Sequence, residues 1–260
     1  MNPATGEAKV QVTADGAIVF DPACAGAERF EPEWFEPAYW RGRGLATDQG
    51  GGRGGVLRVR AGDAEWMLRH YHRGGMVARV LGDRYLWNGA ERTRGFAEFH
   101  LLAELARRGL NVPVPVAARY RRNGVHYRAD LITRYIAPAQ TLAERLRAGA
   151  IDAATAARVG AGIAEFHAVG AYHADLNAHN VLLDARKVWL VDFDRGALRV
   201  PARSWQLANL ARLRRSLLKL GAARDNEQAF DRECWQPLAE AYERALDHGA
   251  THAPAGRGGL

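Results

Sequence analysis

Lysine is the residue that this sequence lacks most clearly. Only Lys9, Lys187 and Lys219 occur among the 36 basic residues, so arginine supplies nearly all of the positive charge. A codon bias explains this ratio without any function. The scarcity still limits mechanism, because any chemistry that depends on a lysine side chain has only three candidates.

Cysteine and long apolar runs are scarce as well. Cys24 and Cys234 are far apart and in no metal-ligand spacing, which favours two reduced thiols in a cytoplasmic protein. No stretch approaches the roughly 18 uninterrupted apolar residues of a membrane-spanning helix. The first 20 residues contain no basic segment followed by an apolar one, so we expect no signal peptide.

The remaining composition is that of a soluble globular protein. The chain has 260 residues, 48% of them hydrophobic and 25% charged, enough for one large domain or two small lobes around a shared cleft. The net charge is +7. A basic balance of this kind indicates acidic partners, such as nucleic acid, an anionic membrane surface or phosphorylated substrates.

The first half of the chain favours strands. The segment "RGRGLATDQGGGRGGVLRVRA" (41–61) passes from a Gly-rich stretch into alternation, which predicts a loop that leads into a strand. Further strands are predicted at "EWMLRHY" (65–71), "VPVPVAARY" (112–120) and "HYRADLITRYI" (126–136). Between them, "TRGFAEFHLLAELARRG" (93–109) has apolar residues at helical spacing and ends at a glycine, which predicts a helix.

The second half becomes helical from "TLAERLRAG" (141–149), and a further helix is predicted from an N-cap at Asp152 to about Gly170. This segregation predicts an α+β fold with a small sheet-rich lobe followed by a larger helical lobe. The expected divisions are an N-terminal extension at 1–40, which packs on the domain through "FEPEWFEPAYW", the sheet-rich lobe at 41–137, the helical lobe at 138–247, and a flexible tail at 248–260.

One polar loop carries the candidate chemistry. In "YHADLNAHNVLLD" (172–184), His173, Asp175 and Asn180 fit the pattern H-x-D-L-x-x-x-N, and Asp192 follows at the end of the apolar run in "VWLVDFDRG". Phosphoryl transfer needs a carboxylate to accept the proton of the attacking hydroxyl and oxygen ligands to hold Mg²⁺ against the nucleotide phosphates. We therefore assign Asp175 as the base, and Asn180 and Asp192 as metal ligands.

A structural interpretation competes with this one. Asp175 and Asn180 are common turn formers, and Asp192 could simply end a strand. Two motifs in this order, at a hairpin-like separation and after a long helix, favour the kinase-type site. His173 fits a structural hydrogen-bonding role in the loop better than a role as base.

The upstream half of a kinase-type site can then be sought. Gly52, Arg53 and Gly54 precede a strand, where backbone N–H groups can approach phosphate oxygens, although such a stretch can equally be a flexible loop. Glu98 lies inside the early helix, where a kinase has a glutamate that pairs with a strand lysine. No lysine lies in the second strand. Arg69 is the cation at that position, and arginine binds phosphate in a forked geometry.

At this point the chain resembles the 3-deoxy-D-manno-octulosonic acid (Kdo) kinase family of Gram-negative bacteria, over roughly residues 30–245. The resemblance is carried by "LRHYHRGG", "FAEFHLLAEL", "HADLNAHNVLLD", "VDFDRG" and "NLARLRRSLLK", and an arginine-for-lysine strand followed by R-G-G is itself a feature of that family. It implies a protein-kinase-like fold and ATP-dependent phosphorylation of the 4-hydroxyl of Kdo on a lipid A precursor. The implied location is the cytoplasmic face of the inner membrane, as a peripheral protein, and the implied catalytic aspartate is Asp175.

A basic segment bears on the substrate. From Arg195 to Arg224 there are eight basic residues and no acidic ones. A line of leucines at near-helical spacing is expected to face the core: Leu207, Leu210, Leu213, Leu217 and Leu220. Arg212 and Arg215 lie off that line. They could form an ordinary solvated face, or a surface for anionic lipid headgroups or for the substrate's own acidic groups. Arg73 is a further candidate for contacts with an anionic sugar.

Two alternatives remain open from the residues. One is a kinase of the same fold for a soluble alcohol, such as an aminoglycoside or a choline-like compound, although a cationic acceptor suits the basic segment poorly. The other is a non-catalytic module, either a pseudokinase, which the missing lysine favours, or a basic nucleic-acid binder. Three retained polar residues in the catalytic pattern argue against a pseudokinase, and no nucleic-acid-binding motif is present, so we expect no nucleic-acid partner.

Overall fold

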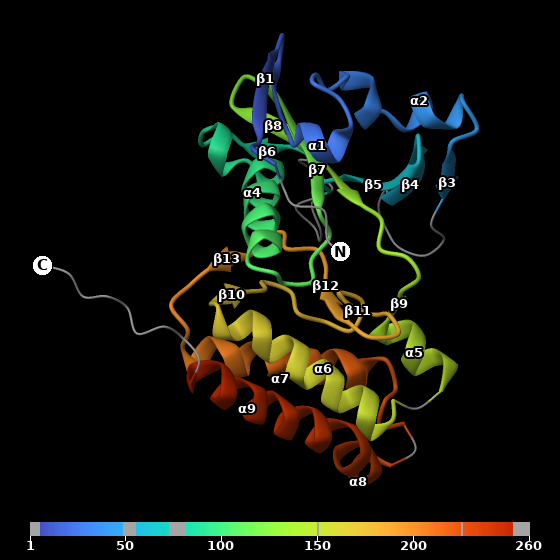
Figure 1. Cartoon of the computed structure of the whole chain (residues 1–260), viewed down its shortest axis with the longest axis vertical. Helices are drawn as coiled ribbons and strands as arrows, with labels where there is room; N and C mark the ends of the chain where they lie inside the picture. Colours follow the sequence, from blue (N-terminus) through green and yellow to red (C-terminus); the bar gives the residue numbers. More distant parts are fainter. Residues whose placement is uncertain (1–5, 49–55, 73–81, 150, 225, 252–260) are drawn as a thin grey trace, which may run out of the picture. The chain divides into compact units, whose positions relative to one another are not determined.

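The computed structural model divides the chain after Ile136 into two compact units, residues 1–136 and 137–260 (Figure 1). It describes residues 6–48, 56–72, 82–149, 151–224 and 226–251.

Unit 1 is built on an antiparallel sheet. The described strands are β1 (Lys9–Thr13), β2 (Gly16–Phe20), β3 (Ala46–Asp48), β4 (Val56–Ala61), β5 (Ala64–His70), β6 (Tyr85–Leu86), β7 (Pro115–Asn123) and β8 (His126–Arg134). Their order is β1-β2-β7-β8-β5-β4-β3, and β6 pairs with β8. The segment expected to be an N-terminal extension therefore contributes two strands to this sheet, because β2 pairs with β7 along its whole length.

The aromatic segment before β3 forms much of the core of unit 1. It contains three short helices: α1 (Pro22–Ala25), η1 (Pro32–Phe35) and α2 (Pro37–Arg41). Phe30, Phe35 and Trp40 are buried: the rings of Phe30 and Trp40 pack on Trp66 of β5, and Phe35 packs on Phe30. Burying aromatic side chains removes a large apolar area from water. The expectation that this segment packs on the domain is confirmed.

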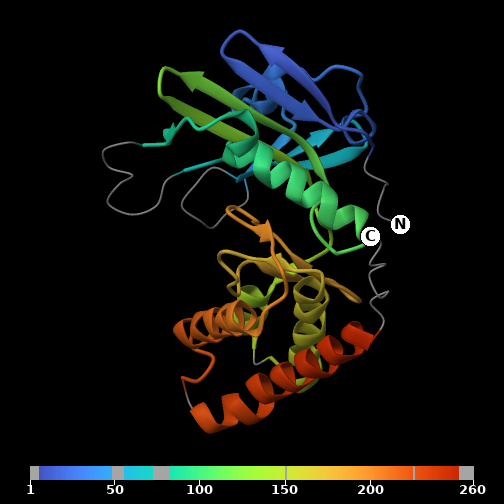
Figure 2. The ribbon, with the colours of Figure 1, turned by 90° about the vertical axis from the view of Figure 1, so that its left-hand side faces the viewer.

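Helix α4 (Arg94–Arg107) follows the short helix η2 (Ala90–Arg92) and runs along the sheet of unit 1 (Figure 2). Its apolar face, which includes Phe96 and Phe99, is buried. A Cβ atom at Gly95 would lie 2.9 Å from the carbonyl oxygen of Asp130 on β8, so a glycine allows the helix to approach the strand closely. This close approach fixes where the next turn of α4, with Glu98, meets the sheet.

Unit 2 is mostly helical (Figure 1). Its described helices are α5 (Leu142–Ala148), α6 (Ala153–Ala168), α7 (Arg203–Lys219), α8 (Glu227–Phe230), η3 (Asp231–Trp235) and α9 (Gln236–Thr251). Its described strands are β9 (Gln140–Thr141), β10 (Ala171–Tyr172), β11 (Val181–Leu183), β12 (Val188–Leu190) and β13 (Ala197–Leu198). The side chain of Asp152 accepts from the backbone N–H of Thr155, which confirms the expected N-cap of α6.

Helices α6 and α9 pack tightly. A Cβ atom at Gly160 would lie 2.0 Å from the carbonyl oxygen of Leu238, a distance that no side chain could occupy without moving one helix. In the last turn of α6, the Nδ1 atom of the buried His167 lies 2.9 Å from the hydroxyl of Tyr242 on α9. Burial lowers the pKa of His167 to about 4, so this ring is neutral at physiological pH.

A sheet-rich unit followed by a helical unit confirms the α+β class. Two details differ from expectation. Unit 1 is not the smaller part of the chain, because the N-terminal strands belong to its sheet. Helix α9 continues to Thr251, so residues 248–251, which were expected to belong to a flexible tail, form its last turn.

Both cysteines are buried and free, and burial raises the pKa of each thiol to about 11. Within the described ranges, no helix has the length and apolar content needed to cross a bilayer.

Candidate active site

The polar loop of unit 2 is closed by a strand pair. Antiparallel pairing of β11 with β12 brings residues 181 and 190 opposite each other. Just beyond this pair, the backbone N–H of Val191 donates to the carbonyl of Asn180 at 3.0 Å. Asn180 and Asp192, twelve residues apart in sequence, are therefore held at the same end of the hairpin. Asp192 has φ +62°, a left-handed conformation that is uncommon for a residue other than glycine.

His173 organises the loop from inside. The backbone N–H of Asp175 donates to its Nδ1 atom at 3.1 Å, so Nε2 carries the proton and donates to the carbonyl of Val191 at 2.9 Å. Burial lowers the pKa of His173, which keeps this tautomer neutral. The imidazole thus ties the start of the loop to its end, the structural role that the sequence favoured.

The carboxylate of Asp175 faces solvent, with 56% of its side chain exposed. One of its oxygens, Oδ1, lies 3.3 Å from Nη1 of Arg212 on α7, and Oδ2 accepts from Nδ2 of Asn177 at 3.1 Å. Its backbone carbonyl accepts from Nδ2 of Asn180 at 3.0 Å. The loop thus presents an accessible carboxylate with a cation beside it, while the backbone behind it is fixed.

Asn180 and Asp192 carry oxygen atoms of the kind that a magnesium ion binds. Because Nδ2 of Asn180 donates to the carbonyl of Asp175, the amide oxygen Oδ1 is the atom left to coordinate a cation. A carboxylate and an amide oxygen are hard ligands of the type that Mg²⁺ prefers, with its other positions taken by phosphate and water oxygens. Among the residues with described placement, no cluster of three or more His, Cys, Asp and Glu is suited to a metal ion.

Unit 1 contains the strand cation and helix glutamate that a kinase-type site has upstream of its catalytic loop. Arg69 on β5 forms an ion pair with Glu98 on α4, and the side chain of Glu98 is only 2% exposed. The hydroxyl of Tyr71 donates to the same carboxylate at 2.7 Å and accepts from Arg69 at 3.1 Å. The structure therefore brings Arg69 and Glu98 together in the way that a strand lysine and a helix glutamate meet in kinases.

Four of the candidate residues cannot be compared with the structure. Gly52, Arg53 and Gly54 of the Gly-rich stretch, and Arg73 after β5, lie outside the described residues. Arg215, the remaining candidate, is exposed on α7, three residues beyond Arg212.

The leucine line of α7 was partly wrong. Leu210, Leu213 and Leu217 are buried as expected, but Leu207 is 48% exposed and Leu220, the C-cap residue, is only half-buried. Two amide side chains share the buried face instead. Gln206 donates to the carbonyl of His167 at 3.3 Å, and Asn209 donates to that of His173 at 3.0 Å, so their burial is compensated by hydrogen bonds.

Tyr71, Asn177 and Asn209 were not predicted from the sequence. Asn209 holds the backbone of His173 from both sides, because its Oδ1 also accepts from the backbone N–H of His173. The available signal was an amide at a core-facing position of α7, within the stretch "NLARLRRSLLK". Tyr71 gave the weaker signal of a tyrosine two residues after Arg69.

These features define the class of protein: a phosphotransferase of the kinase type, with a strand cation paired to a helix glutamate in one unit and an Asp-Asn-Asp set in the other. Residues 37–242 match the model of the lipopolysaccharide kinase (Kdo/WaaP) family. The chain belongs to this family, and the expected protein-kinase-like order of a sheet unit and a helical unit is the one it has.

Relatives with established names are similar over nearly the whole chain. A 3-deoxy-D-manno-octulosonic acid kinase of Xylella fastidiosa (strain 9a5c) is 44% identical over 236 residues, which cover 90% of this chain and 92% of that protein. A protein of the same name from Xanthomonas euvesicatoria pv. vesicatoria (strain 85-10) is 47% identical over 235 residues, with the same coverage.

Among solved structures, a chain described as WaaP in complex with acyl carrier protein is similar at a TM-score of 0.45 and 18% identity, covering 82% of this chain and 96% of that one.

Proposed function

We propose that this chain is an ATP-dependent kinase that phosphorylates the 4-hydroxyl of a Kdo sugar on a lipid A precursor, in the biosynthesis of the lipopolysaccharide inner core. The family and the Kdo kinases at 44% and 47% identity support the reaction. The observation that carries the proposal is the exposed Asp175 carboxylate on a loop whose backbone is fixed by His173 and Asn180.

In the proposed reaction, Asp175 orients the sugar hydroxyl and accepts its proton as the oxygen attacks the γ-phosphorus of ATP. Asn180 and Asp192 would hold Mg²⁺, which when bound would neutralise charge on the phosphates. The bond between the γ-phosphorus and the bridging oxygen breaks, and ADP leaves. Arg212, beside Asp175, is suited to the carboxylate or phosphates of the acceptor, and Arg215 and Arg73 are further candidates for such contacts.

In unit 1, Arg69 takes the role that lysine has in other kinases and binds phosphate oxygens of ATP, while Glu98 holds its guanidinium in position. Gly52, Arg53 and Gly54, which lie outside the described residues, are further candidates for contacts with the phosphates. Arginine can donate to two phosphate oxygens at once, so the exchange of lysine for arginine keeps the charge and changes the contact geometry.

A lipid-linked acceptor places the proposed reaction at the cytoplasmic face of the inner membrane, with the protein bound peripherally to an anionic surface. The net charge of +7 supports this partner. A soluble cationic alcohol, the competing acceptor, would be repelled by the same charge.

An acceptor panel tests the proposal. The protein is incubated with Mg²⁺, γ-labelled ATP and one acceptor at a time: Kdo-bearing lipid A precursor, the same precursor without Kdo, choline, or an aminoglycoside. Label should enter the Kdo-bearing lipid alone. Transfer to choline or the aminoglycoside in preference to the Kdo lipid would contradict the proposed acceptor, and no transfer with any acceptor would contradict the proposed activity.

A further inference from the structure

Two arginines lie side by side on one face of the sheet of unit 1. Arg121 on β7 and Arg128 on β8 are directly opposite partners in the antiparallel pair. Side chains in such positions share one face of the sheet, and like charges there are destabilising. An anion bound between the two guanidinium groups would remove this repulsion.

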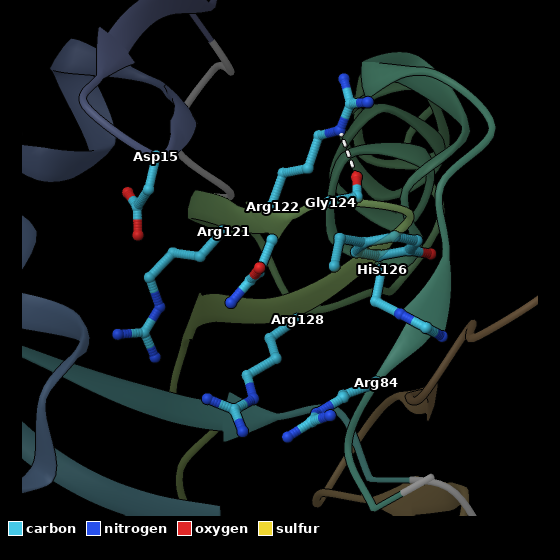
Figure 3. Close-up of a pocket in the computed structure, with 9 residues that line it drawn as sticks. Asp15, Arg84, Arg121, Arg122, Gly124, His126 and Arg128 are labelled. Carbon is cyan, nitrogen blue, oxygen red and sulfur yellow. Dashed lines mark hydrogen bonds between the residues drawn. The ribbon is translucent and has the colours of Figure 1, made fainter.

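A cavity of about 530 Å³ lies at this place. Figure 3 shows the guanidinium groups of Arg84, Arg121 and Arg128 on one side of the strand pair. Arg122 points to the other side, where it donates to the carbonyl of Gly124 at 2.9 Å. Of the residues that line the cavity in the described part of the chain, Asp15 is the one acidic residue. The hollow is therefore rich in donors for an oxyanion.

Acidic residues near Arg121 and Arg128 compensate the positive charge of these two side chains only in part. Arg128 has a close partner, since its Nε lies 2.7 Å from Asp83. Arg121 lies 3.7 Å from Glu36, which is nearer to Arg119 at 2.9 Å. The Nε atom of Arg121 is buried and has no hydrogen-bond partner among the described residues. A buried donor left unsatisfied is costly, and a phosphate oxygen would satisfy it.

Exposed apolar side chains border the cavity. Leu86 on β6 pairs with His126, so the two share the face that carries Arg128, and Leu86 is 65% exposed. Val125, in the turn before β8, is 67% exposed, and its carbonyl accepts from the backbone N–H of Trp87 at 2.9 Å. Arginines beside exposed aliphatic side chains are the combination that lies in the interface of an anionic membrane.

We infer that this hollow of unit 1 binds phosphate groups of anionic lipid headgroups through Arg84, Arg121 and Arg128, with Leu86 and Val125 at the boundary of the acyl chains. The inference rests on the proposed function, in which the acceptor is a lipid at a membrane surface. A free phosphate would use the same arginines but would gain nothing from the exposed Leu86 and Val125.

Helix α7, for which a lipid surface was one of the interpretations that the sequence left open, is less suited to this role. Arg203 pairs with Glu243 at 2.6 Å, and Arg214 pairs with Asp231 at 2.8 Å. Arg212 is placed beside the proposed base. These pairs leave α7 with less uncompensated charge for a lipid surface.

Vesicle binding tests the inference. The full-length protein is sedimented with phosphatidylcholine vesicles that contain or lack phosphatidylglycerol. Wild type should bind the anionic vesicles only. In Arg121→Gln/Arg128→Gln, the affinity should fall roughly tenfold or more. Arg107→Gln/Arg108→Gln, which removes the same charge from the exposed end of α4, should bind within about twofold of wild type. Equal losses in the two variants, or no loss in either, would overturn the assignment.

A second variant and a soluble anion complete the design. Leu86→Ser leaves every charge in place and should lower vesicle affinity by about threefold. If the double arginine variant fails to fold, the vesicle affinity of Leu86→Ser tests the lipid inference in its place. Inorganic phosphate serves as the free ligand. If it competes fully with vesicles at millimolar concentration and Leu86→Ser binds as wild type does, the site takes free phosphate and the lipid assignment is wrong.

Failure of this inference is distinguishable from failure of the proposed function. Asp175→Asn should bind anionic vesicles as wild type does. Kinase activity without vesicle binding would overturn the lipid surface alone, whereas vesicle binding by a protein that transfers no phosphate would overturn the reaction alone.

Discussion

At the scale of single residues, Asp175 is held by its backbone more than by its side chain. Its N–H donates to His173 and its carbonyl accepts from Asn180, while its carboxylate contacts the exposed groups of Asn177 and Arg212. Removing the carboxylate therefore leaves the bonds that shape the loop. This separation allows chemistry and folding to be tested independently at this position.

His173 offers a prediction that separates structure from catalysis. In His173→Gln the loop loses an anchor, and we expect kcat to fall by about tenfold or more through misplacement of Asp175. Because burial keeps the pKa of His173 low and the ring neutral, the acidic limb of the pH–rate profile should not move. The measurement is kcat across pH in wild type and variant. Disappearance of the acidic limb would instead make His173 the titrating base.

Arg69 offers a second prediction at this scale. Arg69→Ala removes the phosphate contact and leaves Glu98 buried without its cation. We expect the KM for ATP to rise about tenfold or more, and the free energy of unfolding to fall by about 2 kcal/mol, less than for a fully buried pair because Arg69 is 21% exposed.

Arg69→Lys serves as the matched control, since it keeps the charge and should retain most of the stability and part of the ATP affinity. ATP titrations and urea unfolding measure both quantities. If Arg69→Ala keeps the wild-type KM for ATP, Arg69 has no part in the phosphate site.

At the scale of elements, three strands of unit 1 share a row of charges. His70 on β5 lies 2.7 Å from Asp130 on β8, which is bound in turn by Arg119 on β7 at 2.9 Å. Asp83 approaches the other ring nitrogen of His70 at 3.0 Å. The hydrogen bond to Asp130 raises the pKa of His70, and the pKa values of Asp130 and Asp83 are lowered by His70 and by arginines.

The sign of these shifts fixes a pH dependence. Because the pKa of His70 is raised on folding, its contribution is complete below its unfolded value of about 6.5 and is lost as pH rises through the folded value. The lowered pKa values of Asp130 and Asp83 give a contribution present above about 3.8 that is lost as pH falls. The row should therefore be most stabilising between these limits.

The expected result is that His70→Asn lowers the free energy of unfolding by about 1 kcal/mol at pH 6 and by much less at pH 9. His100→Asn, on the exposed side of α4, is the matched control and should change little at either pH. Urea unfolding at the two pH values measures the difference. A cost for His70→Asn that stays constant with pH would mean that the ring acts by packing rather than by charge.

At the scale of the whole molecule, local sequence patterns predicted several helices and strands, whereas contacts between distant segments were not predicted. The helix of α4, the N-cap of α6 and the β11–β12 hairpin follow from periodicity and capping within about 20 residues. Pairing of β2 with β7 joins segments about 100 residues apart, and no local signal encodes it. For this reason residues 9–20 were predicted to belong to an N-terminal extension and not to the sheet.

The candidate site divides in the same way. Asp175, Asn180 and Asp192 could be assigned from spacing, because they lie on one loop and the strand that closes it. The support from Asn209 and Tyr71 depends on how α7 packs on the loop and how α4 packs on β5, so it became visible only in the structure. Arg69 was predictable because the chain has no lysine in that strand.

The most direct test of the account is a single-turnover measurement of phosphate transfer from ATP to Kdo-bearing lipid A precursor by wild type and Asp175→Asn. The account predicts that the variant folds, binds ATP with Mg²⁺ as wild type does, and transfers phosphate at least about a thousandfold more slowly, because the acceptor hydroxyl lacks its base. Transfer by Asp175→Asn at a rate near that of wild type would contradict the central claim.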